Sequence, residues 1–271
     1  MIIGTKVFDN EHTHICGILN VTPDSFSDGG KNNSLDKALF RVEEMLNEGM
    51  ELLDIGGESA RPGYTQISDE EEIFRVVPII EAVKGRFDVP ISLDTYKSHV
   101  AKAGISAGVD LINDIWGLKY DPDMAGVIAD ANVACCLMHN RKEAVYNNFM
   151  QDVIDDLKEC VNLAQKAGIA KDKIILDPGV GFAKSYEQNL EVIRRMGEIN
   201  KLGFPQLLGC SRKSVVGLTL DLPVTERVEG TIVTTVMGVL NNALFVRVHD
   251  IEANARAVKM AQAIKNGITG K

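Results

Sequence analysis

Long apolar runs are missing from this 271-residue sequence. No stretch approaches the ~18 consecutive apolar residues that a membrane-spanning helix needs. The first residues, MIIGTKVFDNEH, lack the apolar segment of a secretory signal peptide. We therefore expect a cytoplasmic protein that does not use a membrane as its partner.

Cysteine is scarce, and its spacing does not indicate metal chemistry. The five cysteines are odd in number, include no Cys-x-x-Cys pair, and are Cys16, Cys135, Cys136, Cys160 and Cys210. Four of them lie within apolar runs. We predict buried, reduced thiols rather than a disulfide framework or a zinc site.

A surplus of positive charge is also missing. The sequence has 29 Lys and Arg against 38 Asp and Glu, a formal net charge of −9. An acidic surface argues against nucleic acid or a membrane as the main partner. It does not exclude an anionic small molecule, provided that cationic side chains gather at one site.

What the sequence does contain is a repeated alternation of short apolar runs with longer segments of helical periodicity. Eight runs are strand candidates: 15–21, 51–56, 89–95, 110–115, 133–139, 174–179, 205–211 and 244–250. Eight strands with a helix after each predict an α/β fold, a closed (β/α)8 TIM barrel formed by residues 1–271 as a single domain. The alternative is an open doubly wound sheet, which normally has fewer strands. Residues 1–13 precede the first strand and are expected to form a short N-terminal hairpin on the barrel floor.

Local signals mark several helix ends. Ser68-Asp-Glu-Glu71 and Ser185-Tyr-Glu-Gln188 fit a capping box, in which side chains satisfy unpaired amides of the first helical turn. Gly49, Gly168 and Gly203 stand where helices should end, because glycine readily adopts the left-handed cap conformation.

Polar residues accumulate at the ends of the predicted strands. In a parallel barrel these ends form one face, where such enzymes place their sites. Unpaired charges are costly to bury, so the residues need one another or a ligand. The alternative, that each caps the next helix or turn, suits Asp250 and Asp54 but not eight strands at once. The strand-end residues are Asn20, Asp54, Asp94, Asn113, Asp114, His139, Asp177, Ser211 to Lys213, Arg247 and His249.

Asp94, Asn113 and Asp177 could together bind a heterocycle. Carboxylates accept hydrogen bonds and an amide both donates and accepts, which suits the amino-pyrimidinone edge of a pterin. The same residue types would suit a purine or a sugar. A buried hydrogen-bond network without a ligand is an equally good interpretation of these three residues.

Arg247 and His249 are two residues apart on one predicted strand, so their side chains point to the same side. An arginine can clamp a phosphate through two N–H groups, and a histidine beside it suits an anionic leaving group. Asn20, at the end of the first strand, offers a neutral oxygen to Mg²⁺, which usually binds few protein ligands.

Two loops are rich in turn residues: NVTPDSFSDGG (20–30) and GGESARPG (56–63). Both are interpreted as lids over the barrel mouth, although ordinary exposed loops have similar glycine content. A third segment, GCSRKSVVG (209–217), brings positive charge and could present the Ser214 amide at a helix start. It lacks the GxxxxGK[ST] spacing of a nucleotide-binding P-loop.

These segments resemble the successive motifs of the dihydropteroate synthases. The similarity extends over nearly the whole chain and follows the family's order. It is most specific in the first loop, SRKS and RVHD. The matching segments are GILNVTPDSFSDGG (17–30), GGESARPG (56–63), DT (94–95), IND (112–114), LMH (137–139), LDPGVGFAK (176–184), SRKS (211–214) and RVHD (247–250).

The resemblance implies condensation of 6-hydroxymethyl-7,8-dihydropterin diphosphate with p-aminobenzoate, giving dihydropteroate and pyrophosphate in folate biosynthesis. It also implies Mg²⁺, a homodimer and inhibition by sulfonamides. The site residues that it implies are Asn20 for Mg²⁺; Asp94, Asn113, Asp177 and Lys213 for the pterin; Arg247 and His249 for the diphosphate; and Phe26, Arg61, Pro62, Met138, Phe182, Lys213 and Ser214 around the substrates.

One position departs from the family's pattern. Many members have threonine before the Arg-Pro of the second loop, where this chain has Ala60. A hydroxyl contact made there is absent, which affects one substrate contact and not the reaction.

Two other functions would use part of the same residues. A corrinoid-dependent, pterin-binding methyltransferase would share the Asp/Asn pocket but would not need the diphosphate site. A non-catalytic pterin-binding paralogue should have lost part of the anion site, yet Asn20, Arg247 and His249 are all present. Both are disfavoured.

Overall fold

The computed structural model describes residues 1–21, 31–58 and 65–267, with residues 31–34 described by their backbone alone. Eight parallel strands form its central sheet, in the order β8-β7-β6-β5-β4-β3-β10-β9. A parallel bridge between Leu176 and Gln206 links β8 to the residue before β9 and closes the ring. The (β/α)8 barrel is therefore confirmed, and the open doubly wound sheet is wrong. The strands are β3 (His14–Asn20), β4 (Leu52–Gly56), β5 (Ile91–Asp94), β6 (Leu111–Asp114), β7 (Ala134–Met138), β8 (Ile174–Asp177), β9 (Leu207–Leu208) and β10 (Phe245–Val248).

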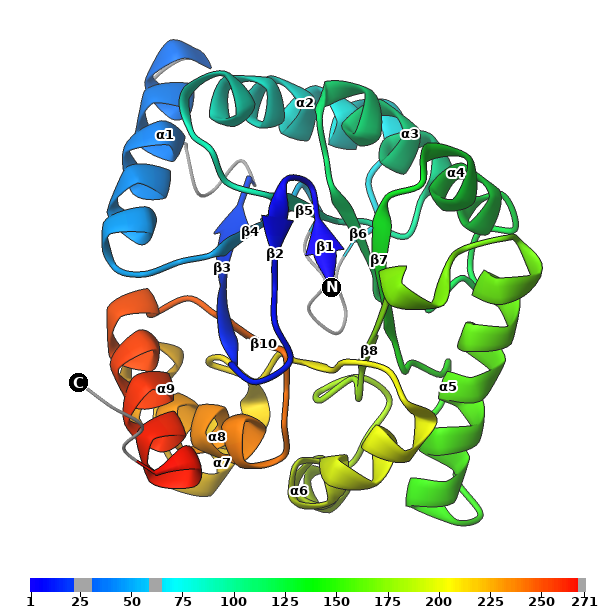
Figure 1. The fold of residues 1–271 in the computed structure, drawn as a ribbon, viewed down its shortest axis with the longest axis vertical. Helices are drawn as coiled ribbons and strands as arrows, with labels where there is room; N and C mark the ends of the chain where they lie inside the picture. Colours follow the sequence, from blue (N-terminus) through cyan, green and yellow to red (C-terminus); the bar gives the residue numbers. More distant parts are fainter. Residues whose placement is uncertain (22–30, 59–64, 268–271) are drawn as a thin grey trace.

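Helices surround the strands on the outside (Figure 1). They are α1 (Lys31–Asn47), α2 (Asp69–Arg86), α3 (Ser98–Ala107), α4 (Met124–Ala131), α5 (Phe149–Lys166), α6 (Tyr186–Arg195), α7 (Ser214–Leu220), α8 (Val228–Leu240) and α9 (Ile251–Asn266). Short 3₁₀ turns are η2 (Lys171–Lys173), η3 (Met196–Leu202) and η4 (Val224–Glu226). The helices bury apolar faces such as Val76, Ile80 and Val83 of α2, because amphipathic helices must cover the outer face of the barrel.

The expected hairpin is present at the N-terminus. Strands β1 (Ile2–Ile3) and β2 (Lys6–Val7) pair antiparallel and lie in front of the barrel in Figure 1. Ile3 and Phe8 belong to the apolar cluster formed by early residues of the barrel strands, including Cys16 and Phe245. This contact covers the floor, so the opposite, carboxyl end of the strands is left as the barrel mouth.

The predicted helix ends are largely confirmed. Ser185 and Gln188 form both halves of a capping box at α6. Ser68 accepts from the Glu71 amide at α2, whereas the Glu71 carboxylate accepts from Arg75 instead of closing the box. The glycines at 49, 168 and 203 all have positive φ, as a left-handed cap requires.

The five cysteines are buried and unbridged, as predicted. No helix within the described ranges is long and apolar enough to cross a membrane.

Candidate active site

The strand ends at the barrel mouth place several predicted site residues side by side. In the sheet register Asn20 of β3 lies opposite Gly56 of β4, Gly56 opposite Asp94 of β5, and Asp94 opposite Asn113 of β6. Residues at or next to the carboxyl ends of neighbouring parallel strands thus form one row. Asn113 is buried and Asn20 is exposed at the rim. Asp94 and Asn113, two of the three residues predicted to act together, are neighbours in this register.

Arg247 joins two strand-end carboxylates. Its Nε donates to Asp54 Oδ2 at 2.5 Å, and its NH2 group donates to Asp94 Oδ2 at 2.7 Å. Ser92 Oγ donates to the other Asp54 oxygen at 2.5 Å. Arg247 is 18% exposed at its side chain, whereas Asp54 is 1% exposed. The buried Asp54 therefore fixes the guanidinium at Nε, and one NH2 group is directed at Asp94.

This cluster changes the acidity of its members. Burial raises the pKa of Asp94 to about 7, although the Arg247 charge opposes the rise. The pKa of Arg247 is raised against the opposing effect of burial, because Asp54 and Asp94 both stabilise its charge. Asp54 does not cap a helix or turn, so that sequence-based interpretation of Asp54 was wrong.

A second group of contacts centres on Asp177 and Lys213. Asp177 is buried at the end of β8, where its carboxylate accepts from the Gly179 amide at 2.6 Å. Lys213 Nζ donates to the Val180 carbonyl and lies 4.8 Å from the centroid of the Phe182 ring. Burial raises the pKa of Asp177 and lowers the pKa of Lys213, and each charge partly offsets the shift of the other. Asp177 and Lys213, both predicted to bind the pterin, are therefore close enough to stabilise each other's charge.

Apolar side chains complete one side of this region. Met138, Tyr96 and Ile115 form a small buried cluster, and Trp116 and Phe182 pack against it. Met138 of β7 lies opposite Asp177 of β8 in the register. Apolar side chains beside a carboxylate suit a heterocycle. Within the described part of the chain, the buried Trp116 Nε1 has no hydrogen-bond partner.

His249 follows directly after β10. Its Nδ1 lies 2.9 Å from Ser211 Oγ, and its backbone amide donates to the same hydroxyl at 3.1 Å. The end of β10 is thereby connected to the segment after β9. Ser214, the first residue of α7, is exposed. Asp250 occupies the N-cap position of α9, but its carboxylate pairs with Arg212 and makes no side-chain capping bond.

The sequence interpretation missed a buried cation next to the second loop. Lys97 Nζ donates to Glu58 Oε2, Glu72 Oε2 and the Ile67 carbonyl, each at 2.8 Å. Glu58 also accepts from the Ile67 amide at 2.8 Å. The two described ends of that loop are thus held together by one lysine. Phe26, Ala60, Arg61 and Pro62 lie outside the described residues.

Metal ligands are sparse. Across residues 1–21, 31–58 and 65–267, no group of three or more His, Cys, Asp and Glu side chains is arranged to hold a metal ion. Asn20 Oδ1 lies at the mouth, where a Cβ added to Gly56 would sit 3.7 Å from it.

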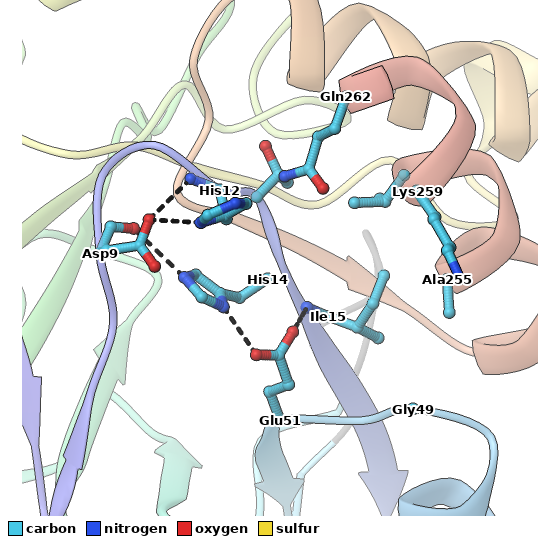
Figure 2. A pocket seen from close by; sticks show the side chains of 11 residues that line it. Asp9, His12, His14, Ile15, Gly49, Glu51, Ala255, Lys259 and Gln262 are labelled. Carbon is cyan, nitrogen blue, oxygen red and sulfur yellow. Dashed lines mark hydrogen bonds and ion pairs between the residues drawn. The ribbon is translucent and has the colours of Figure 1, made fainter. Parts of the chain in front are cut away.

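A hollow of about 380 Å³ lies at the opposite end of the barrel (Figure 2). Four of its polar side chains pair with one another: Asp9 contacts His12 Nδ1 at 2.7 Å, and Glu51 contacts His14 Nδ1 at 2.7 Å. In TIM barrels this floor serves stability, and the chemistry takes place at the mouth.

Comparison with known proteins identifies the family. The family model described as "Pterin binding enzyme" matches residues 16–249. A dihydropteroate synthase from Clostridium beijerinckii is 58% identical over 266 residues, covering 97% of this chain and 99% of that protein. The chain belongs to the dihydropteroate synthase family.

Solved dihydropteroate synthase structures have the same fold. The enzyme from Clostridium difficile, crystallised in the presence of pteroic acid, is 47% identical with a TM-score of 0.92, covering 94% of this chain and 97% of that one. The Yersinia pestis dihydropteroate synthase in a sulfonamide drug complex is 38% identical with a TM-score of 0.92, covering 98% and 99% of the two chains. The family resemblance in the sequence motifs is thus confirmed over the full barrel.

Proposed function

We propose that this member of the dihydropteroate synthase family condenses 6-hydroxymethyl-7,8-dihydropterin diphosphate with p-aminobenzoate. The products are 7,8-dihydropteroate and pyrophosphate. The observation that carries the proposal is the Asp94–Arg247 contact at the barrel mouth. It places a group suited to a pterin edge in contact with a group suited to a diphosphate.

In this mechanism the pterin ring lies among Asp94, Asn113, Asp177 and Lys213, with Met138 and Phe182 beside it. Asp94 and Asp177 stabilise positive charge that develops on the ring as the C–O bond to pyrophosphate breaks. Arg247 and His249 stabilise the departing anion. The path is therefore SN1-like.

The neutral arylamine nitrogen then attacks the cationic carbon and scarcely needs a strong general base. Phe26, Arg61, Pro62 and Ser214 are proposed to enclose p-aminobenzoate. The set of strand-end residues argues against the methyltransferase and non-catalytic alternatives, because neither needs the diphosphate site that Arg247 and His249 are proposed to form.

We further propose that Mg²⁺ accompanies the diphosphate, with Asn20 as its protein ligand. One exposed amide oxygen fits a cation that is held mainly by water and phosphate oxygens. When bound, Mg²⁺ supplies positive charge that offsets the charge of pyrophosphate.

Asn20→Ala is expected to raise the Mg²⁺ concentration for half-maximal turnover by about 10-fold, equivalent to ~1.4 kcal/mol. The cause is the loss of the single amide oxygen. Magnesium titration of the initial rate measures it, and isothermal titration of Mg²⁺ with bound dihydropterin diphosphate provides a second readout. Asn10→Ala, an exposed asparagine on the floor side, is the control. An unchanged Mg²⁺ requirement in Asn20→Ala would contradict the assignment.

The proposed function is tested by incubating the protein with dihydropterin diphosphate, p-aminobenzoate and Mg²⁺ and assaying dihydropteroate. Pyrophosphate release without p-aminobenzoate would support the SN1-like order. Absence of dihydropteroate under all conditions would overturn the proposed reaction. Inhibition by a sulfonamide, competitive with p-aminobenzoate, is expected in the same assay.

We also propose a homodimer of single-domain subunits located in the cytoplasm. The five unbridged cysteines agree with a reducing compartment. Support for the dimer comes from exposed apolar residues on neighbouring helices α7, α8 and α9, which lie together in Figure 1. These residues are Leu218, Leu220, Val233, Leu240, Met260 and Ile264.

Val233→Glu is expected to shift the protein from dimer to monomer, because Val233 is 63% exposed on α8 and a carboxylate there would be desolvated in an interface. Light scattering during size-exclusion chromatography measures the mass. Val145→Glu, which changes a similarly exposed valine in the segment between β7 and α5, is the control. A monomeric wild-type protein would exclude the dimer.

A further inference from the structure

The loop between β8 and α6 has an unusual backbone. Gly179, Gly181 and Ala183 have φ values of 70°, 85° and 43°. Ala183 has a Cβ, so its left-handed conformation costs roughly 1–2 kcal/mol. A Cβ at Gly179 would lie 1.9 Å from the His139 carbonyl oxygen. Such a backbone persists only when its surroundings hold it in place.

Lys184 provides much of that support. Its Nζ lies 2.9 Å from the Gly179 carbonyl oxygen, 3.1 Å from the Phe182 carbonyl oxygen and 2.8 Å from His139 Nδ1. These three acceptors match the three N–H donors of an ammonium group. The side chain therefore folds back over its own loop and ties the loop to the end of β7.

His139 is fully buried and can accept this bond. Its Nε2 lies 3.0 Å from Asp156 Oδ2 on α5, a carboxylate that also accepts from Arg141 Nε at 2.6 Å. Because a carboxylate only accepts, His139 carries its proton on Nε2 and leaves the Nδ1 lone pair for Lys184. Burial lowers the pKa of His139 to about 4, so the ring is neutral near pH 7.

We propose that Lys184 is a positioning residue, whose ammonium group holds the 178–184 loop in the conformation that binds substrate. The inference rests on the proposed function. The loop carries the Val180 carbonyl that accepts from Lys213, and Phe182, which packs near Met138 and Trp116. Without the Lys184 contacts, the Val180 carbonyl and the Phe182 ring are no longer held in place at the barrel mouth.

Titration of Lys184 gives this role a pH dependence. Burial lowers its pKa to about 7, a shift that Asp177 and Asp156 oppose and that Lys213 and Arg141 increase. A neutral amine has two N–H donors, and its lone pair then faces the Nδ1 lone pair of His139. The loop is therefore held less firmly as the pH rises above about 7.

The test is Lys184→Met, which retains an unbranched side chain but lacks the ammonium. We expect KM for p-aminobenzoate and dihydropterin diphosphate to rise about 10–100-fold with a much smaller change in kcat, from the loss of charge-assisted hydrogen bonds. The emission of Trp116, the single tryptophan, should shift to longer wavelength in the ligand-free variant as its packing loosens. Lys173→Met is the matched control, because Lys173 donates one exposed bond to the Asn132 carbonyl at the other end of β8.

Wild-type KM values within about twofold in a folded Lys184→Met variant overturn the inference, since three hydrogen bonds would then contribute nothing. If that variant does not fold, KM of Lys184→Gln and the pH dependence of KM in the wild type test the inference instead. KM in the wild type should rise above about pH 7. A flat wild-type KM from neutral to alkaline pH overturns the inference, as does unchanged KM in Lys184→Gln. An inactive wild type, in contrast, would refute the proposed reaction itself.

Discussion

Asp94→Asn is expected to lower turnover by about 10²–10³-fold, the usual effect of removing one electrostatic partner of a transition state. The amide preserves the shape of the side chain but removes the negative charge that would stabilise the ring cation. It also exchanges the ion pair with Arg247 for a weaker contact. Steady-state kinetics with circular dichroism as a folding check measure the effect.

The same residue gives a pH signature. Because the pKa of Asp94 is raised to about 7, the carboxyl is protonated in the free enzyme below that pH. The value of kcat/KM for dihydropterin diphosphate should therefore fall as the pH decreases through about 7, and Asp94→Asn should lose this acid limb. Asp110→Asn, which removes the partner of Lys84 at the floor end of β6, is the control. Near-normal turnover in Asp94→Asn would refute the assigned site.

Arg247→Ala is the second change with a large expected effect. Removing the guanidinium should reduce kcat by at least about 10²-fold, because the departing pyrophosphate loses its clamp. The variant should also be less stable by roughly 3–5 kcal/mol, since Asp54 and Asp94 lose their cationic partner in a largely buried environment. Thermal unfolding is therefore measured beside the kinetics.

Arg247→Lys separates the two effects. A lysine keeps one positive charge near Asp54 and Asp94 and so preserves much of the stability, but it cannot donate as a planar fork. We expect a melting temperature close to the wild type together with a large loss of kcat. A variant that is both stable and fully active would show that Arg247 does not bind the leaving group as proposed.

Much of the fold could be predicted because its signals are local. Alternating apolar runs predicted the eight strands, and Ser185 with Gln188 predicted the start of α6. The strand-end position of Asp94 and Asn113 also followed from the parallel architecture, in which the last residues of successive strands must meet. In each case the evidence lies within a few residues of the position predicted.

The remaining parts of the site depend on partners that are distant in the sequence. A cap remained a plausible alternative for Asp54, because its partner Arg247 follows 193 residues later. Lys97, with carboxylates 39 and 25 residues before it, gave no sequence signal of a buried cation. His139 and Lys184 belong to matching motifs, but neither spacing nor composition indicates that a lysine donates to a neutral histidine. Side-chain pairing of this kind is decided by the packing of the barrel.

The position of Arg247 between two carboxylates has a consequence for selectivity. One NH2 group of its guanidinium donates to Asp94. With the site residues as proposed, an anion without a ring would have to compete with that internal carboxylate. A pterin diphosphate would bind Asp94 through its ring and the released guanidinium through its diphosphate. Binding would thus exchange the Asp94–Arg247 contact for two contacts with the substrate. Affinity would be highest for a molecule that carries both the ring and the diphosphate.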